Sequence, residues 1–402
     1  MISVEEAFKQ VVESVEPLEV VDRPLGESVG YTLAETIVAH MPLPPFDNSA
    51  MDGYALRVED VAKAVKETPV WLKLIGEVPA GSFFEKPLHP GEVVRIMTGA
   101  PVPSTANAVV KLEETRLRDG QVEIREPVTV GKHIRRKGED VSVGQEVLRH
   151  GTTIRLQHLG LLASLGKNSV KVYRTPSVSV LTTGSELVAI GRPLLPGKIH
   201  NTNGLVLQKL LERMGIVLHD LGTVQDDPEH LKRLIEASPV SDFLIISGGV
   251  SVGKYDYVKE VLQELGMKTI FWRVAMKPGQ PLLFGHLNQQ WVFGLPGNPI
   301  SCVVCFLIFV RTAIQKMMGI SHPQLPMVQA TLQKGLSKQD GRRHYLTATL
   351  REEHGELFAT PTDKQGSGMF ASLAEANAFI IIPEERDALE KGELVDVLRF
   401  DG

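Results

Sequence analysis

The sequence predicts a multidomain protein that joins a doubly wound α/β domain to β-rich regions. At 402 residues the chain is too long for a single compact core. Beyond Pro176, strand-like apolar segments alternate with amphipathic helical ones, which is typical of a mainly parallel sheet covered by helices. Short β-like segments punctuated by Gly and Pro fill 42–155, and β signals return after Pro323.

The individual elements follow from local pattern. The first residues predict a helix, because Ser3 and Glu6 match a capping box ahead of an apolar stripe. The β-rich region and the α/β region then have these expected elements: strands at 91–97 and 121–125, a helix at 156–165, strands at 177–181, 216–219, 243–247 and 269–274, and helices at 205–214, 228–237 and 257–265. The last part of the chain predicts four strands: 345–350, 357–360, 378–382 and 394–398.

Composition excludes several classes of protein. A hydrophobic content of 43% with 23% charged residues is typical of a soluble globular protein, and a net charge of -5 disfavours general nucleic-acid binding. No signal peptide is recognisable, and the apolar run 300–310 is too short to span a membrane, so it predicts a buried helix. The two cysteines, Cys302 and Cys305, lie in that run, which favours inert buried thiols over a redox pair. Together these features indicate a cytoplasmic protein.

A glycine-rich turn between a buried strand and a helix is the strongest local signal. The segment Ser247 to Gly253 follows an apolar strand, so backbone N–H groups and a helix terminus should surround an anion. The spacing of Gly248, Gly253 and Lys254 nearly matches a P-loop, but Tyr255 stands where a small hydroxyl would ligate magnesium. The turn therefore predicts a phosphate-bearing ligand and disfavours a P-loop NTPase.

Acidic residues recur where the strands of the α/β region should end. Glu186, Asp226 and Asp256 are candidates to hold Mg²⁺, which would bridge phosphate oxygens. Two of these candidates have an ordinary structural alternative: Asp256 could cap the next helix, and Glu186 could complement a helix dipole. Asp226 has none, whereas its neighbour Asp227, directly before Pro228, is a good N-cap.

Two acids lie outside this region. Asp52 and Asp140 occur in turns of the N-terminal part, and for Asp52 simple turn chemistry is the alternative.

Rigid turns at 277–281 and 294–299 punctuate buried strands. Lys277 and Arg273 are either solvated cations or anion contacts, and the basic run 135–137 is most simply a solvated loop. Neither Thr98 nor Ser251 has a histidine at motif spacing, so a hydrolase triad is not supported.

Five segments stand out as an ordered set: Phe46 to Ala55, Arg95 to Ala100, Thr183 to Leu187, Ser247 to Gly253 and Gly294 to Pro299. Together they resemble one family, the molybdopterin molybdenumtransferases, or MoeA family, which includes the gephyrin E domain. The resemblance spans essentially the whole chain, and the ordered set is far more specific than any one glycine motif.

The resemblance implies an elongated homodimer of four-domain subunits. The implied boundaries are an α/β domain related to the MogA-type adenylyltransferase at 1–22 and 174–322, a small linking domain at 23–41 and 141–173, a β-rich domain at 42–140, and a C-terminal barrel-like β-domain at 323–402. It also implies an active site at the dimer cleft, between the α/β domain of one subunit and the β-rich domain of the other.

The implied reaction is the last step of molybdenum cofactor synthesis. Such an enzyme takes adenylylated molybdopterin and molybdate, inserts molybdenum at the dithiolene sulfurs and releases AMP with Mg²⁺. Its further partners would be the upstream adenylyltransferase and the molybdoenzymes that accept the cofactor, with no nucleic acid and no membrane. A nucleotide pyrophosphatase on the same fold, or a scaffold protein, are the alternatives.

The family's functional positions map onto this chain. Those implied in catalysis are Asp52, Thr98, Asp140, Glu186, Asp226 and Asp256, of which Glu186, Asp226 and Asp256 are the metal candidates. Those implied in substrate binding are Ser247, Gly248, Gly249, Ser251, Gly253, Arg273, Lys277, Pro296, Pro299, Arg342 and Ser367, the last two linked to molybdate. Two departures stand out: Arg273 occupies a position where lysine is common, and Gln280 replaces a second lysine.

Overall fold

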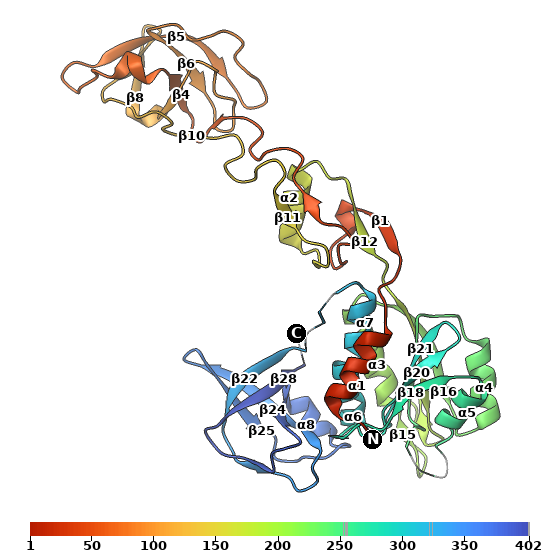
Figure 1. Ribbon diagram of the computed structural model, residues 1–402. Coiled ribbons are helices and arrows are strands. Elements are labelled where there is room, and N and C mark those ends of the chain that lie inside the picture. The colour runs from red at the N-terminus through yellow and green to blue at the C-terminus, as the bar shows by residue number, and fades with distance from the viewer. Residues whose placement is uncertain (252, 254–255, 321, 324, 401–402) are drawn as a thin grey trace.

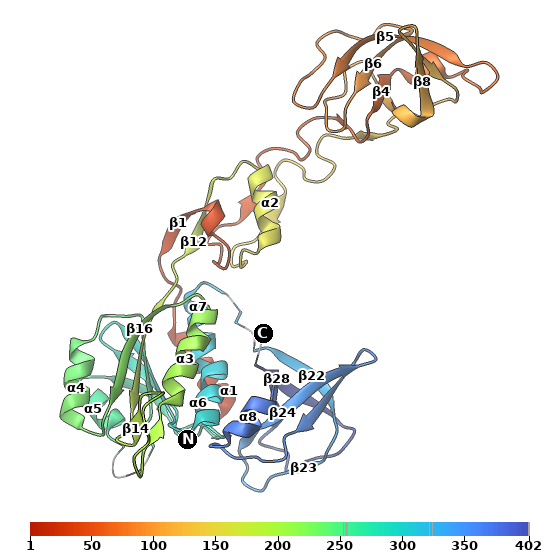
Figure 2. The same ribbon diagram turned by 180° about the vertical axis from the view of Figure 1, so that it is seen from behind.

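The computed structural model describes residues 1–251, 253, 256–320, 322–323 and 325–400. The molecule is elongated, with the α/β and C-terminal domains together at one end and a β-rich domain at the other (Figures 1 and 2). The predicted combination of α/β and β-rich parts is confirmed. Lys254 and Tyr255, on which the comparison with a P-loop rests, lie outside the described residues.

The α/β domain is built on a six-stranded mixed sheet. Its strands in spatial order are β16 (Val217–Val224), β13 (Ser177–Thr183), β17 (Phe243–Ser247), β21 (Gln290–Leu295), β20 (Leu283–Leu287) and β18 (Lys268–Trp272). The first four are parallel, and β20 alone runs against them, because it is antiparallel to both β21 and β18. The predicted mainly parallel sheet is thus confirmed, with the hairpin β20–β21 added.

Helices cover both faces of this sheet. One face carries α1 (Val4–Ser14), α3 (Thr202–Arg213) and α6 (Pro299–Cys305), and the other carries α4 (Pro228–Ala237) and α5 (Val258–Glu264). The predicted cap of the first helix is present, since the Ser3 hydroxyl accepts a hydrogen bond from the Glu6 N–H at 3.0 Å.

The longest helical segment lies between the α/β sheet and the C-terminal domain (Figures 1 and 2). It comprises α6, a π-helical turn (Phe306–Val310) and α7 (Arg311–Met317), and its side chains up to Val310 are almost all buried. Phe309 and neighbouring side chains share a core with the sheet and with Tyr345 and Phe379 of the C-terminal domain. At 19 residues the helix is longer than the apolar run 300–310 predicts, and in the described part of the chain it alone has the length and composition of a membrane span. It is a buried core helix, as predicted, since 83% of its most apolar stretch is buried inside the protein.

The two cysteines lie inside this helix. Both are free and buried, and burial raises the pKa of Cys302 to about 12 and the pKa of Cys305 well above its ordinary value. Because thiolates are the reactive form, both thiols are poor nucleophiles and poor metal ligands.

The C-terminal domain is a closed five-stranded barrel. Going round it, the strands are β24 (Arg343–Glu353), β25 (Glu356–Pro361), β22 (Met327–Leu332), β28 (Leu394–Arg399) and β26 (Ala378–Ile382), which pairs back with β24. Two smaller features join it to its surroundings: β19 (Met276–Lys277) pairs with the start of β24, and α8 (Phe370–Glu375) packs beside α6.

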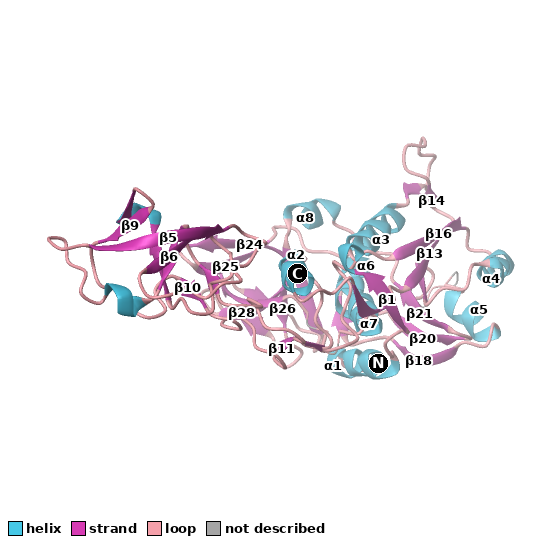
Figure 3. Ribbon diagram, turned by 90° about the horizontal axis from the view of Figure 1, so that it is seen from above, coloured by secondary structure: helices cyan, strands magenta, loops and turns pink. Residues whose placement is uncertain are grey.

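The opposite end holds the β-rich domain (Figure 3), and a narrow linking region connects it to the rest of the molecule (Figures 1 and 2). The β-rich sheet has the order β7 (Ala108–Lys111), β4 (Gly53–Leu56), β6 (Glu92–Ile96), β5 (Val70–Val78), β9 (Gln121–Ile124) and β8 (Thr115–Arg118). The linking region contains β1 (Val20–Pro24) paired with β12 (Ser169–Tyr173), β2 (Ile37–Val38) paired with β11 (Glu146–Leu148), and α2 (Leu156–Ser164).

Short elements complete the fold. They are β3 (Asn48–Ser49) with β10 (Ile134–Arg135), β14 (Leu187–Val188) with β15 (Ile199–His200), β23 (Leu336–Ser337) with β27 (Ala388–Leu389), and 3₁₀ turns at Leu25–Glu27, Val58–Val61 and Leu112–Glu114. The β-rich domain, the barrel and the linking region each have an apolar core of their own. The domain boundaries implied by the sequence stay a prediction.

An ion pair anchors the linking region to the α/β domain. The Arg174 guanidinium donates to both carboxylate oxygens of Asp242 at 2.8 and 2.9 Å, and it also pairs with Glu19. Asp242 further accepts from the N–H and hydroxyl of Ser177. Burial acts to raise the pKa of Asp242, but the hydrogen bonds from Arg174 and Ser177 outweigh it and lower that pKa. Both chain crossings between the two domains therefore meet at the Arg174 guanidinium, which Glu19 and Asp242 share.

Asp242→Asn should lower the free energy of unfolding by about 1–3 kcal/mol at neutral pH, because the guanidinium of Arg174 loses the more buried of its two carboxylate partners. The native pKa of Asp242 is depressed, so its contribution is present above the ordinary carboxyl pKa and disappears as the pH falls through the native value. Urea unfolding at neutral and acid pH measures the difference, with Asp220→Asn at an exposed position of β16 as control. An equal loss at both pH values would contradict this account.

Candidate active site

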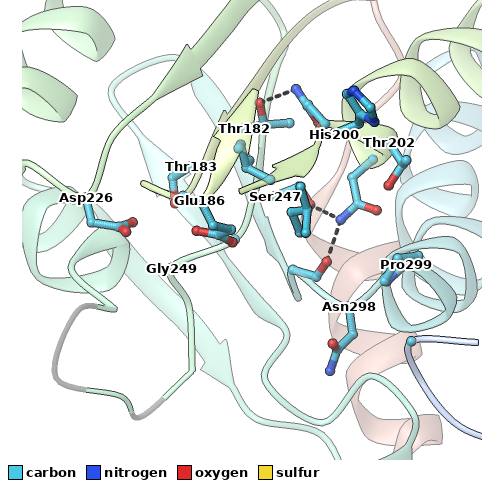
Figure 4. A pocket seen from close by; sticks show the side chains of 18 of the residues that line it. Thr182, Thr183, Glu186, His200, Thr202, Asp226, Ser247, Gly249, Asn298 and Pro299 are labelled. Carbon is cyan, nitrogen blue, oxygen red and sulfur yellow. Dashed lines mark hydrogen bonds between the residues drawn. The ribbon is translucent and has the colours of Figure 1, made fainter. Parts of the chain in front are cut away.

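A cavity of about 770 Å³ opens where the carboxyl ends of the parallel strands meet, as expected for this class of sheet (Figure 4). We call it the glycine-turn pocket. Its lining includes the ends of β13 and β17, the start of α3 and the start of α6. The residues are Thr182, Thr183, Gly184, Glu186, Leu187, Ile199, His200, Asn201, Thr202, Asn203, Asp226, Ser247, Gly248, Gly249, Gly253, Asp256, Gly297, Asn298, Pro299, Gly368 and Phe370.

Two positions of the glycine turn, Gly248 and Gly249, require glycine. Gly248 and Gly249 have φ values of 104° and 64°, in the left-handed region that side chains disfavour. A Cβ on Gly248 would lie 2.4 Å from the Thr183 carbonyl oxygen, and one on Gly249 would lie 2.7 Å from a Val258 methyl. The backbone of the turn therefore passes directly over the end of β13, which leaves it open to a ligand on the pocket side.

Asparagines at the start of α3 connect the walls of this pocket. The Asn203 amide donates to the Ser247 hydroxyl at 3.0 Å and to the Gly297 carbonyl at 2.8 Å, joining the ends of β17 and β21. Asn201 caps α3 through its acceptance from the Gly204 N–H. Neither asparagine was singled out from the sequence, although Asn201 before a helical stripe is an N-cap signal.

Three of the predicted acids line the glycine-turn pocket. Asp226 accepts from the Ser185 N–H at 2.9 Å, Asp256 accepts from the Gly253 N–H at 2.6 Å, and the exposed Glu186 folds over Gly184. Figure 4 shows Glu186 and Asp226 on the side away from Asn298. Among the described residues, no three acidic, histidine or cysteine side chains stand close enough to hold a metal by themselves.

The structural alternatives for these acids are now resolved. Asp227 caps α4, accepting from the N–H groups of Glu229 and His230. Asp256 does not cap α5, whose first residue is Val258 and whose N-terminus has no side-chain cap. The helix-dipole explanation for Glu186 is wrong, because the chain continues from Glu186 into β14.

The polar character of this pocket is unusual for a phosphate site. Its described lining carries three carboxylates and neither lysine nor arginine. The Thr183 hydroxyl, in contrast, is buried beside the glycine turn without a hydrogen-bond partner. A buried hydroxyl usually has a partner, so Thr183 marks a place where a ligand atom would complete the site.

A second cavity of about 650 Å³ lies between the α/β domain and the barrel; we call it the cationic pocket. Its charged and hydroxyl groups include Lys277, Arg342, Ser301 and Ser367. Arg342 donates hydrogen bonds to Gln280 on one side and to Asp340 on the other. Asp340 is the only carboxylate in the described lining.

The two pockets adjoin. Asn298 lines both, and the segment 366–370 contributes Ser367 to the cationic pocket and Phe370 to the glycine-turn pocket. The start of α6 therefore forms the partition between them, with Pro299 on one side and Ser301 on the other.

The remaining predicted residues fall outside these pockets. Ser251 is exposed, and Pro296 contributes only its carbonyl, which accepts from Ser247. Arg273 lines neither pocket, and its guanidinium lies 5.4 Å from the ring centre of Trp272. A role of these three residues in binding stays a prediction.

Asp52, Thr98 and Asp140 belong to the other end of the molecule. Asp52 accepts from the N–H and the hydroxyl of Thr98, both at 2.7 Å, and these bonds lower the pKa of Asp52. The exposed carboxylate thus ties two turns of the β-rich domain together, far along the molecule from the glycine-turn pocket (Figure 1). Asp140 is exposed, and its backbone N–H donates to the Leu43 carbonyl.

Comparison with known families accounts for the whole arrangement. A family model described as a probable molybdopterin binding domain matches residues 179–316, which contain the glycine turn. The models of the MoeA N-terminal region (domain I and II) and the MoeA C-terminal region (domain IV) match 2–166 and 329–400. The α/β domain is thus of the molybdopterin-binding class, and the chain belongs to the MoeA family.

Individual relatives agree over full length. The chain is 36% identical to a molybdopterin molybdenumtransferase of Haemophilus influenzae, covering 100% of this chain and 99% of the relative. It is 37% identical to the enzyme of the same name from Bacillus subtilis, covering 99% and 94%. A crystal structure of a molybdopterin biosynthesis MoeA protein from Pyrococcus horikoshii superposes with a TM-score of 0.86 at 34% identity, covering 100% of both chains.

Gly248→Ala should destabilise the α/β domain by about 2–4 kcal/mol, because the new Cβ meets the Thr183 carbonyl and the φ is strained. It should also change the fluorescence of Trp272, whose indole N–H donates to the Val250 carbonyl in the same turn. Gly160→Ala, at an exposed site within α2 with open space, is the control and should stabilise by about 1 kcal/mol. Similar effects of the two variants would contradict the assigned turn geometry.

Proposed function

We propose that this chain catalyses the insertion of molybdenum into molybdopterin, with adenylylated molybdopterin in the glycine-turn pocket and molybdate in the cationic pocket. The chain is then a transferase of the last step of molybdenum cofactor synthesis. The observation that carries the proposal is the adjacency of two pockets of opposite character, which meet at Asn298.

The glycine-turn pocket suits the phosphate-bearing substrate. The Gly248 N–H donates to the Leu295 carbonyl and the Gly253 N–H donates to Asp256, so the phosphate oxygens are assigned to the Gly249 N–H between them and to the unpartnered Thr183 hydroxyl. The carboxylates of Glu186, Asp226 and Asp256 would repel a bare phosphoanhydride, so their presence argues for a divalent cation that arrives with the substrate.

That cation is proposed to be Mg²⁺. The three carboxylates supply the hard oxygen ligands that Mg²⁺ prefers, and Mg²⁺ is commonly held by one or two carboxylates together with substrate phosphates. When bound, it would offset the charge of the phosphoanhydride whose hydrolysis releases AMP. In this chain Asp226 and Asp256 are already oriented by backbone N–H groups, which leaves their other oxygens toward the pocket.

The cationic pocket suits a tetrahedral dianion. Lys277 and Arg342 supply charge, and Ser301 and Ser367 supply hydroxyl groups from opposite walls. Insertion replaces a molybdenum–oxygen bond by bonds to the two dithiolene sulfurs, and the released oxygen leaves as water with the two thiol protons. Because the pockets adjoin, the oxyanion and the dithiolene would need to move little to meet.

The residues at the far end of the molecule are proposed to act in a second subunit. Asp52 and Thr98 lie on the β-rich domain, at the opposite end of the chain's long axis from its own glycine-turn pocket. A two-fold homodimer would bring them to the partner's pocket. Asp52 and the Thr98 hydroxyl would then complete the site in the cleft between two subunits.

Asp226→Asn should reduce molybdate-dependent AMP release by about two orders of magnitude or more, because a proposed cation ligand is lost. Asp227→Asn is the matched control: its carboxylate only caps α4, so stability should fall by up to ~1 kcal/mol while activity persists. The assay contains purified protein, adenylylated molybdopterin, molybdate and Mg²⁺. Absence of molybdate-dependent AMP release by the unchanged protein would refute the proposed function.

The shared site predicts complementation between two inactive variants. When Asp52→Ala and Asp226→Ala proteins are mixed and allowed to exchange subunits, about half of the dimers are mixed, and each mixed dimer has one intact site out of two. Activity should therefore recover to roughly a quarter of the unchanged level. No recovery, in mixtures that sedimentation shows to have exchanged, would place Asp52 outside the partner's site.

A further inference from the structure

The cationic pocket contains a carboxylate at its centre. Asp340 accepts from Arg342 Nε at 3.2 Å and Nη2 at 2.6 Å, and its other oxygen lies 2.7 Å from His344 Nε2. Lys277 Nζ, which reaches in from the α/β domain, is 3.7 Å away. One carboxylate thus contacts three of the positive or hydrogen-bond-donating groups that face this pocket.

Gln280 completes the arrangement on the other side of Arg342. Arg342 Nη1 donates to the Gln280 amide oxygen at 2.9 Å, so the guanidinium is held between Gln280 and Asp340. A lysine at position 280 could not accept this bond and would repel Arg342. The glutamine found here therefore orients the arginine without adding charge to the pocket.

The charge on Asp340 persists over the working pH range. Burial acts to raise the pKa of Asp340, but the hydrogen bonds from Arg342 and His344 outweigh it and hold that pKa far below its usual range. Burial, Lys277 and Lys338 lower the pKa of His344, which Asp340 offsets only in part. The imidazole is therefore neutral at neutral pH and donates its Nε2–H to the carboxylate.

We propose that Asp340 competes with the oxyanion for the two cations of the pocket. Its carboxylate accepts hydrogen bonds from Arg342 and partly neutralises the charge of Lys277, and so limits the affinity of the pocket for a tetrahedral dianion. This inference rests on the proposed function of the pocket. A dianion seated on Lys277 and Arg342 shares both cations with a carboxylate of like charge. The other described lysine in the lining, Lys338, cannot compensate fully, because its ammonium is buried against the Glu384 carbonyl.

Limited affinity serves an enzyme that must pass the oxyanion on. Tight binding of the substrate in its ground state lowers KM and kcat together, since the same free energy must be given up on the way to the transition state. A resident carboxylate also gives Arg342 and Lys277 a partner while the pocket is empty, which keeps the guanidinium in position between turnovers.

Asp340→Asn is the decisive variant, because it removes the charge and retains an oxygen that accepts from Arg342. Titration calorimetry with sodium molybdate and with sodium sulfate, on the full-length protein, should show a Kd about tenfold lower than that of the unchanged protein for both dianions. In turnover, KM for molybdate and kcat should fall together. Asp396→Asn, which neutralises an exposed acid on β28, is the control and should change neither.

The outcomes separate this inference from the proposed function. A Kd for molybdate that is unchanged or higher in Asp340→Asn would show that Asp340 only positions Arg342, and would overturn the inference. If the unchanged protein bound no molybdate, or bound it equally well after Arg342→Ala, the assignment of the cationic pocket itself would fail. A defect in folding cannot imitate the expected result, because the expected change is a gain in affinity.

Discussion

The buried helix that runs from Pro299 to Met317 is the constraint on which the site depends. Its apolar side chains form one continuous core with the α/β sheet and with the inner edge of the barrel, so the two domains are fixed against each other. The cationic pocket is built from both of them, with Lys277 on one wall and Arg342 on the other. The pairing of β19 with the start of β24 then holds these two cations beside each other.

The same helix also divides the site. Its N-terminal residues lie between the pockets, with Asn298 exposed to both, Pro299 toward the glycine turn and Ser301 toward the cations. Asn203 then ties the neighbouring Gly297 to the end of β17. Two ligands of different chemistry can thus be held by one rigid partition, which is what a transfer between them requires.

The two pockets also differ in the charge of the side chains that line them. Carboxylates dominate the pocket assigned to the phosphates, and cations dominate the pocket assigned to the oxyanion. Under the proposed function, the first pocket would take a divalent cation with the phosphates and the second a dianion. Asp340 is then proposed to moderate the charge of the second pocket from within.

Much of the fold could be predicted from local pattern, because helices and strands follow from side-chain periodicity and caps. The α/β alternation, the buried helix and the Ser3 cap all depend on residues close in sequence. The glycine turn was also recognisable, since Gly248 and Gly249 meet a steric need that no other residue satisfies. The resemblance to the family could also be recognised from the sequence, because the family's motifs are short and contiguous.

What tertiary structure alone decided is which of these residues meet. Lys277, Gln280, Asp340 and Arg342 come from two domains, and the contact between Gln280 and Arg342 joins positions 62 residues apart. The hydrogen bonds of Asn203 to Ser247 and Gly297 are likewise long-range, so they could not be predicted from local sequence patterns. The sequence determined the elements and the kind of chemistry, because these depend on neighbouring residues. The separation of that chemistry into two adjoining pockets depends on how sheet, helix and barrel pack together.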